Sequence, residues 1–245
     1  MKKKEFYQNH HTSDKSFNIY QEILIRKDIK SIVQKEIMSE DCDTSKIEYL
    51  DIGCGTGKRT KLFKNFLDNF YEHISVSGLD ISSDNINEAE KRGINVICSD
   101  IEHEKLPIKA DFITCFEVIE HIYDTDGFVR NVQDTLHQNG ILLISTPNTV
   151  SLKNRIAMLL GVAPLNLEVS LKRYYGLKFF NGFFKDFEPS GHIRGFTPLS
   201  FKEILEKNGF NVKFLWGLEN WRSLKFLGYF PTVATNVLIL ARRSK

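Results

Sequence analysis

A short glycine-rich segment is the part of this sequence whose residue types and spacing point most directly to chemistry. In Asp51-Ile-Gly-Cys-Gly-Thr-Gly57, three glycines alternate with other residues directly after an apolar run that ends in an aspartate. Glycine has no Cβ, so the backbone can turn sharply and approach a ligand closely. A loop that enters a helix also presents N–H groups to a polar ligand. The residues expected to bind a cofactor here are Asp51, Gly53, Cys54, Gly55 and Gly57.

The spacing of the glycines excludes two common nucleotide-binding loops. A dinucleotide fingerprint G-x-G-x-x-G needs its third glycine at position 58, where the chain has Lys58. A phosphate-binding P-loop ends in Gly-Lys-Ser/Thr, and here Arg59 follows the lysine. The pattern that remains is D-x-G-x-G-x-G.

Two more acids follow strand-like segments, at 74–80 and 95–100. Ligands of open α/β sheets bind at the carboxyl ends of the strands, where the strand order reverses. A carboxylate such as Asp80 can accept hydrogen bonds from both hydroxyls of a ribose, and Asp100 with Ile101 suits an adenine amino group and ring. Singly, each acid is more simply a helix cap or loop carboxylate. Together with the glycines they favour a cofactor site, which we expect to include Ile81, Phe116 and Glu117 as well.

Alternating strand and helix patterns predict the elements that position these residues. Strands are expected up to the glycine loop and at 74–80, 95–100, 111–116, 140–146, 210–216 and 235–241, and helices at 18–38, 58–71, from 82 or 83, at 124–137 and at 198–208. Such alternation predicts an α/β fold with a mostly parallel sheet and crossover helices. We expect one domain over 1–245, with an N-terminal arm and helix at 1–38 and an insertion at 149–197.

The motif D-x-G-x-G-x-G resembles the first motif of class I S-adenosylmethionine-dependent methyltransferases. The resemblance implies a doubly wound, Rossmann-like sheet with an antiparallel last strand and helices on both faces. It implies that the glycine loop passes under the methionine part of S-adenosylmethionine. Asp51 would then orient the loop or contact the methionine amino group.

Two histidines are candidates for the chemistry of methyl transfer. Methyl transfer to a hydroxyl requires an aligned acceptor and removal of its proton, which suits an imidazole. His121 follows the fourth strand in Glu117-Val-Ile-Glu-His121, and His192 begins His-Ile-Arg-Gly-Phe-Thr197. Glu117, Glu120 and His121 would share one helical face if the strand turned directly into a helix. We therefore predict His121 and His192 as catalytic residues.

These segments, with Ser145-Thr-Pro-Asn148, resemble a broad subgroup related to ubiquinone-pathway O-methyltransferases. In those enzymes the E-x-x-E-H motif is associated with a divalent metal, and small-RNA 2′-O-methyltransferases use a similar motif with a further histidine. If a metal is bound, its ligands are Glu117, Glu120, His121 and His192. A metal is not our main expectation, because helical carboxylates are usually solvated.

Composition narrows the partners. A formal charge of +2 does not predict nucleic-acid or membrane binding. The sequence has no run of about 18 apolar residues, so a transmembrane segment is not expected. Scattered cysteines indicate a reducing, cytoplasmic location. The insertion, with seven Lys/Arg against three Asp/Glu, is expected to form a helical lid over a small acceptor, and its positive charge suits an anionic one. The expected recognition residues are Asn148, Asn154, Arg155 and Arg194. Apolar residues at 226–230 suit a homodimer, a lipid-linked acceptor or the core.

These observations lead to three hypotheses. The first is S-adenosylmethionine-dependent O-methylation of a small molecule such as a sugar or a phosphorylated metabolite. The second is metal-assisted 2′-O-methylation of RNA, which the absence of an evident RNA-binding domain disfavours. The third is a module that binds S-adenosylmethionine without transferring its methyl group.

Overall fold

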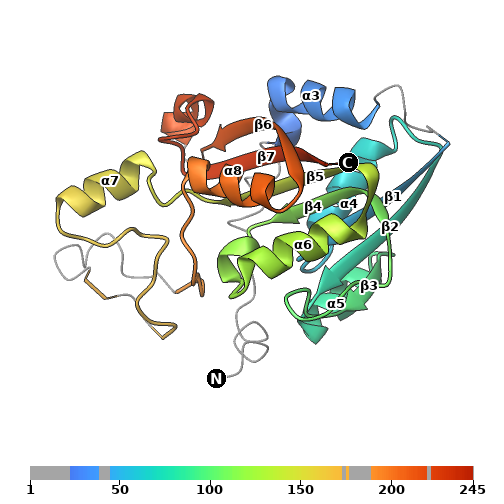
Figure 1. The fold of residues 1–245 in the computed structure, drawn as a ribbon, viewed down its shortest axis with the longest axis horizontal. Coiled ribbons are helices and arrows are strands. Elements are labelled where there is room, and N and C mark those ends of the chain that lie inside the picture. The colour runs from blue at the N-terminus through green and yellow to red at the C-terminus, as the bar shows by residue number, and fades with distance from the viewer. Residues whose placement is uncertain (1–22, 39–44, 173–174, 177–188, 220–221, 245) are drawn as a thin grey trace.

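The computed structural model describes residues 23–38, 45–172, 175–176, 189–219 and 222–244, and the expected arm at 1–17 lies outside them. Within the described residues, a single sheet is built from β1 Lys46–Ile52, β2 His73–Asp80, β3 Asn95–Cys98, β4 Ala110–Phe116, β5 Leu136–Pro147, β6 Phe210–Leu218 and β7 Asn236–Arg243. The strand order is β3-β2-β1-β4-β5-β7-β6 (Figure 1).

The pairing of the strands confirms the predicted sheet. The pairs β1–β2, β1–β4, β2–β3 and β4–β5 are parallel, whereas β7 is antiparallel to both β5 and β6. The strand order reverses between β1 and β4, so a crevice opens outside the carboxyl ends of these two strands. The glycine loop follows β1 and the E-x-x-E-H motif follows β4. Both predicted ligand-binding segments therefore lie at the point of reversal.

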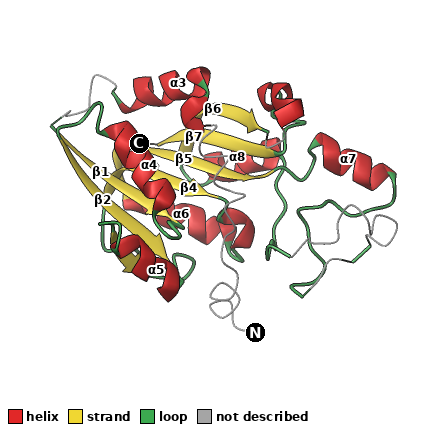
Figure 2. Cartoon of the chain, turned by 180° about the vertical axis from the view of Figure 1, so that it is seen from behind, coloured by secondary structure: helices red, strands yellow, loops and turns green. Residues whose placement is uncertain are grey.

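Helices cover both faces of the sheet, as Figures 1 and 2 show from opposite sides. The described α-helices are α3 Lys27–Ile37, α4 Lys58–Leu67, α5 Ser83–Glu90, α6 Thr125–Thr135, α7 Leu152–Leu159 and α8 Pro198–Lys207, and η1 Ile119–His121 and η3 Arg222–Tyr229 are short 3-10 segments. Alternate residues of the strands pack into two apolar cores, one on each face of the sheet. Leu143 packs with α3 and α4, and its neighbours Leu142 and Ile144 pack with α6 and α8.

Several boundaries differ from the expectation for local reasons. The N-terminal helix is interrupted at Arg26, whose backbone is extended (ψ 111°) and whose guanidinium donates hydrogen bonds to the carbonyls of Gly217 and Gly228. Helix α6 is directly followed by β5 at Leu136. Helix α8 begins as expected, with Pro198 in its first turn and the Thr197 hydroxyl accepting from a backbone N–H.

The insertion lies beyond the carboxyl end of β5, at the left of Figure 1. Its described part contains α7, and Leu159 at the end of this helix and Leu160 after it are exposed. The described residues 161–172 and 189–196 form no helix, and Tyr175 is exposed. Among the described residues, no helix has the length and apolar character that a membrane crossing requires.

Candidate functional site

The glycine loop makes the sharp turn expected of it through a left-handed backbone at each of its three glycines. Gly53, Gly55 and Gly57 have φ values of 71°, 54° and 77°, a region that residues with a Cβ enter only at a cost. A Cβ on Gly57 would lie 2.4 Å from Ile94 Cδ1, and one on Gly53 would lie 2.5 Å from Val118 Cγ2. Glycine is therefore required here both by the backbone and by the neighbouring side chains.

Asp80 holds the glycine loop at the carboxyl end of β2. One carboxylate oxygen accepts a hydrogen bond from the Gly55 backbone N–H (2.9 Å), and the other accepts from Ser82 N–H (2.8 Å). Asn85 Nδ2 also donates to the oxygen that accepts from Ser82 N–H (3.4 Å), so the second lone pair of the oxygen bonded to Gly55 N–H is the one left to accept from a ribose. Asp80 thus shapes the loop, a role that its sequence position alone did not indicate.

Asp51 is fully enclosed beneath the loop. Its two oxygens accept from the hydroxyls of Thr114 on β4 (2.7 Å) and Thr60 on α4 (2.6 Å). Burial raises the pKa of Asp51, and the nearby Arg59 opposes this shift. Of the two roles expected for Asp51, these contacts favour orienting the loop.

Arg59 is a site residue that the sequence analysis did not single out. Its guanidinium donates to the Gly53 carbonyl (2.7 Å), and its positive charge lowers the pKa of Glu117 and of Glu120 against the larger effect of burial. Arg59 stands two residues after the last glycine of the motif, and this position is the sequence feature that could have identified it as a site residue.

The other predicted cofactor residues differ in how their side chains are placed. Asp100, in the loop after β3, is half-buried and accepts from Glu102 N–H (3.1 Å), and Ile81, directly after β2, is also half-buried. Ile101 is buried among apolar residues of the α6 face. Phe116 packs on Phe63 of α4, with ring centroids 5.4 Å apart. The adenine-binding roles of Asp100 and Ile101 stay predictions, and any contact of Phe116 with a cofactor would come from its backbone.

Glu117, Glu120 and His121 do not share the helical face that was expected for them. Glu117 has a φ of 56°, and only the 3-10 segment η1 follows, so β4 does not turn directly into an α-helix. The Glu117 carboxylate accepts from Ser145 Oγ (2.7 Å) and from Asn236 Nδ2 (2.8 Å), and it is not among the groups that converge with His121 and His192. Burial raises its pKa. Glu117 is therefore not part of the metal-ligand set predicted from the motif.

Three of the four predicted ligands do converge, namely Glu120, His121 and His192, which we call the histidine cluster. One potential ligand atom from each lies within 4.8 Å of the others, and the two imidazole centroids are 4.9 Å apart. Glu120 is 1% exposed, and its Oε2 accepts from the hydroxyl of Thr146 (3.2 Å). Its Oε1 has no hydrogen-bond partner among the described residues and lies 3.9 Å from His192 Nε2. The carboxylate is buried, contrary to the expectation that it would be solvated.

Backbone carbonyls fix the tautomers of both histidines. Nδ1 of His121 lies 3.1 Å from the Gly191 carbonyl, and Nδ1 of His192 lies 3.2 Å from the Asn166 carbonyl. A carbonyl oxygen only accepts, so each Nδ1 carries the proton and each Nε2 carries the lone pair. Burial lowers the pKa of His192, which favours its neutral form. Both imidazoles are thus arranged to accept a proton or to bind a cation through Nε2.

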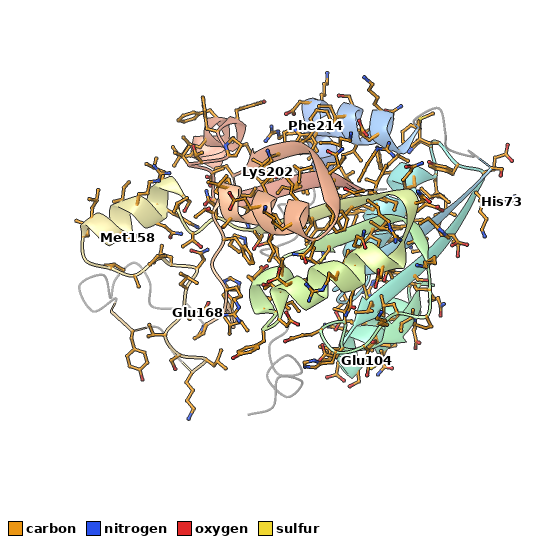
Figure 3. The ribbon with its side chains drawn as sticks, viewed as in Figure 1. His73, Glu104, Met158, Glu168, Lys202 and Phe214 are labelled. Carbon is orange, nitrogen blue, oxygen red and sulfur yellow. The ribbon has the colours of Figure 1, made fainter. Side chains whose placement is uncertain are left out.

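Glu168 of the insertion holds His192 in place. Its carboxylate accepts from three successive backbone N–H groups, those of Ser190 (2.9 Å), Gly191 (3.0 Å) and His192 (2.8 Å). Figure 3 labels Glu168 on the insertion, on the side toward the sheet. The backbone N–H groups that follow, at 193 and 194, donate to the Glu120 carbonyl. No sequence pattern linked Glu168 to His192, because the contact closes a long loop.

The polar side chains expected to recognise an acceptor donate hydrogen bonds to backbone carbonyls in and around the insertion. Asn148 donates to the carbonyls of Pro231 and Ala234, and Asn154 donates to the Asn148 carbonyl. The two arginines behave alike: Arg155 donates to the carbonyls of Val150 and Thr232, and Arg194 donates to the Tyr123 carbonyl with its guanidinium over the Tyr123 ring. Their predicted role in acceptor binding is not supported by these contacts.

Comparison with known proteins identifies the family. The model of the methyltransferase domain family matches residues 20–213. A ubiquinone biosynthesis O-methyltransferase of Rickettsia canadensis is 33% identical over 141 residues, 55% of this chain and 55% of that protein. The chain thus matches about half the length of this curated relative.

Solved structures share the fold. An S-adenosylmethionine-dependent methyltransferase from Mesorhizobium loti aligns with a TM-score of 0.57 at 16% identity, covering 87% of this chain and 96% of that one. The magnesium protoporphyrin IX methyltransferase of Synechocystis, with bound S-adenosylhomocysteine, also gives 0.57 at 16% identity, over 98% and 92%. At this identity the likeness concerns the fold alone. With the family match and the sheet order, it means that the chain belongs to the class I S-adenosylmethionine-dependent methyltransferases of the methyltransferase domain family.

Proposed function

We propose that the protein transfers the methyl group of S-adenosylmethionine to a hydroxyl oxygen of a small-molecule acceptor. The observation that carries this proposal is the histidine cluster, which lies directly after β4, at the reversal of strand order and next to the glycine loop. Two imidazoles whose Nδ1 atoms face backbone carbonyls, which leaves each Nε2 to accept, suit removal of a hydroxyl proton at this position. The named O-methyltransferase relatives support the same atom class.

In this proposal, S-adenosylmethionine supplies the methyl group as an electrophile when bound, and the chain's residues orient and deprotonate the acceptor. His121 Nε2 accepts the hydroxyl proton, because its Nδ1 already donates to the Gly191 carbonyl. His192, whose Nε2 likewise carries a lone pair, accepts a hydrogen bond from a second hydroxyl of the acceptor and so helps to keep the reacting oxygen in line with the methyl group. Glu120 lies beside both imidazoles, with one potential ligand atom of each residue within 4.8 Å of the others, and its Oε1, unpartnered among the described residues, can accept from the N–H that forms when His121 takes the proton.

The residues of the histidine cluster also fit a divalent metal ion. Two Nε2 lone pairs and one unpartnered carboxylate oxygen form a mixed N/O donor set, which suits Zn, Fe or Mn. The carbonyls behind both Nδ1 atoms supply the second-shell contacts usual for metal-bound histidines. A bound ion would polarise the acceptor hydroxyl and lower its pKa. Its ligands would be Glu120, His121 and His192.

Further parts of the proposal concern the acceptor and the setting. The acceptor is a sugar or a phosphorylated metabolite, the whole chain acts as one domain with the insertion as its lid, and the protein works in the cytoplasm. The described cysteines Cys54, Cys98 and Cys115 are free thiols, which supports a reducing compartment. The exposed Phe226, Tyr229 and Phe230 give a homodimer a plausible apolar surface.

Transfer of labelled methyl groups tests this function. The protein is incubated with methyl-labelled S-adenosylmethionine and a panel of hexoses, sugar phosphates and catechols, with and without a chelator. We expect His121→Ala to lower transfer by about 10²–10⁴-fold without changing the affinity for S-adenosylhomocysteine. The exposed His103→Ala serves as the matched control. Label that moves to a nitrogen or a carbon atom, or transfer that His121→Ala leaves intact, would overturn the proposal.

One observation favours a second candidate, methylation of an RNA 2′-hydroxyl: the second histidine, His192, converges with the motif as the resemblance to small-RNA methyltransferases implies. This candidate predicts that binding of a short RNA weakens steeply with salt and that a chelator abolishes transfer to it. Salt-independent or absent RNA binding would eliminate it.

A further inference from the structure

A second buried polar cluster lies beside the histidine cluster and has no part in the reaction described above. It consists of Glu117 at the end of β4, Lys153 of α7, Glu219 after β6, and Asn236 at the start of β7; we call it the Lys153 cluster. Glu219 and Asn236 are 4% and 3% exposed. The adjacent Ser145 and Thr146 of β5 hydrogen-bond Glu117 and Glu120 respectively. Since successive strand residues point to opposite faces, the two clusters flank the end of β5 on either side.

The sheet and α7 bring the Lys153 cluster together. Asn236 pairs with Pro147 of β5 and with Leu218 of β6, so the start of β7 lies at the carboxyl ends of both strands. The first turn of α7 is fixed to the chain just before β7, because Leu152 N–H donates to the Val233 carbonyl (2.9 Å). Lys153 is the next residue of that turn.

The amide of Asn236 is oriented by its neighbour. Its Nδ2 donates to the Glu117 carboxylate, an acceptor that would repel the amide oxygen, so the orientation of the amide is set. Oδ1 is left buried, with no hydrogen-bond partner among the described residues. Buried polar atoms in native proteins nearly always have partners, which points to a donor supplied by a ligand.

Lys153 offers the complementary group. It is half-buried and makes no hydrogen bond or ion pair with the other described residues, yet the charges of Glu219 and Glu117 act on its ammonium. Burial, the larger effect, lowers its pKa. Glu219 itself accepts from the hydroxyl (2.6 Å) and the N–H (3.2 Å) of Thr235. The cluster therefore presents one ammonium donor and one amide acceptor, and the negative charges of Glu219 and Glu117 act on the ammonium.

We propose that Lys153 and Asn236 bind two neighbouring hydroxyls of a neutral, sugar-type acceptor, next to the hydroxyl that is methylated. A hydroxyl both donates and accepts, so a vicinal pair satisfies the Asn236 oxygen and the Lys153 ammonium together. A phosphate or a carboxylate would accept from Lys153, but it would offer no hydrogen to Asn236 and would meet the two carboxylates. The side chains of the Lys153 cluster are all polar, which suits an aliphatic polyol better than an aromatic ring. This inference rests on the proposed function and names its substrate class.

Binding to the S-adenosylhomocysteine complex tests the inference without requiring methyl transfer. Calorimetry is performed with a panel of methyl hexopyranosides, with hexose phosphates, with inorganic phosphate and with catechol. We expect at least one neutral glycoside to bind and Lys153→Met to weaken its binding by about tenfold or more, the loss of one charged hydrogen bond. Lys172→Met, at an exposed lysine of the same insertion, is expected to leave its binding unchanged. Asn236→Ala is expected to match Lys153→Met, and if it fails to fold, the lysine variant still decides.

Each other outcome overturns the inference. No bound glycoside, tighter binding of hexose phosphate, inorganic phosphate or catechol, or glycoside binding that Lys153→Met leaves unchanged would remove the sugar subsite. Loss of S-adenosylhomocysteine affinity in Lys153→Met would assign the cluster to the methionine end of the cofactor. The proposed O-methylation fails separately, if wild-type protein with bound cofactor transfers no methyl group to any hydroxyl.

Discussion

Glu168 is the residue whose replacement tests how His192 reaches the site. Its carboxylate accepts from the N–H groups of Ser190, Gly191 and His192 at 2.9, 3.0 and 2.8 Å. A hydrogen bond to a charged group contributes about 1.5–3 kcal/mol. Ser190 is exposed, so water replaces its bond at little cost. With two bonds left to lose, we expect Glu168→Ala to weaken the docking of this segment by about 3–6 kcal/mol.

Glu168→Gln is the gentler and more informative change, because its amide oxygen still accepts while the charge is gone. We expect about half the loss, 1.5–3 kcal/mol, which is roughly a ten- to hundredfold larger opening constant. Hydrogen exchange read by mass spectrometry measures that constant for the backbone N–H groups of residues 191–194. Methyl transfer should fall in parallel, because His192 leaves the site, while affinity for S-adenosylhomocysteine stays as in the wild type.

The matched control is Glu206→Gln, at an exposed glutamate on α8. It should alter neither exchange at 191–194 nor methyl transfer. The reasoning is refuted if Glu168→Gln exchanges at the wild-type rate over 191–194, or if faster exchange there leaves methyl transfer intact.

Two further predictions concern the glycine loop and the histidine cluster. Gly57→Ala forces a Cβ into a left-handed residue (φ 77°) and against Ile94 Cδ1 at 2.4 Å, so we expect it to cost about 1–2 kcal/mol of stability and to weaken S-adenosylhomocysteine binding, measured by thermal unfolding and calorimetry. The second prediction concerns Glu120, whose pKa burial raises well above 4.5. Its protonated form therefore contributes stability that is fully present below pH 4.5, and this contribution is lost as the pH rises through the folded-state pKa. Glutamine does not ionise, so Glu120→Gln does not lose this stability. In chelator-treated protein, the free energy of unfolding of the variant should therefore rise relative to that of the wild type by up to about 1.4 kcal/mol per pH unit. Equal melting temperatures of the two proteins at pH 5 and pH 8 would contradict this.

The fold followed from the sequence because its signals are local. Alternating strand and helix patterns, together with the resemblance, predicted the parallel sheet and its antiparallel strand, and the glycines predicted the sharp turn after β1. The end of β4 was harder. Spacing in the E-x-x-E-H motif assumed an α-helix, whereas the left-handed Glu117 sends its carboxylate to Ser145 and Asn236, away from His121.

The rest of the site depends on contacts between distant parts of the chain. Glu168 lies 24 residues before His192, and Asn236 lies 119 residues after Glu117. No periodicity or motif encodes such pairs, since they form only when the insertion and β7 pack at the end of β5. The hydrogen bonds of Asn148, Asn154, Arg155 and Arg194 to backbone carbonyls were equally out of reach, because those partners are set by tertiary structure.

The central claim is that the glycine loop and Asp80 form an S-adenosylmethionine site. Calorimetric titration with S-adenosylhomocysteine tests it directly, in the wild type and in Asp80→Ala, which removes both the contact with Gly55 N–H and the predicted ribose acceptor. The account predicts saturable 1:1 binding to the wild type and a loss of about a hundredfold or more in Asp80→Ala, the effect of two charged hydrogen bonds. Wild-type protein that binds neither S-adenosylhomocysteine nor S-adenosylmethionine, or an Asp80→Ala variant that binds as well as the wild type, would contradict it.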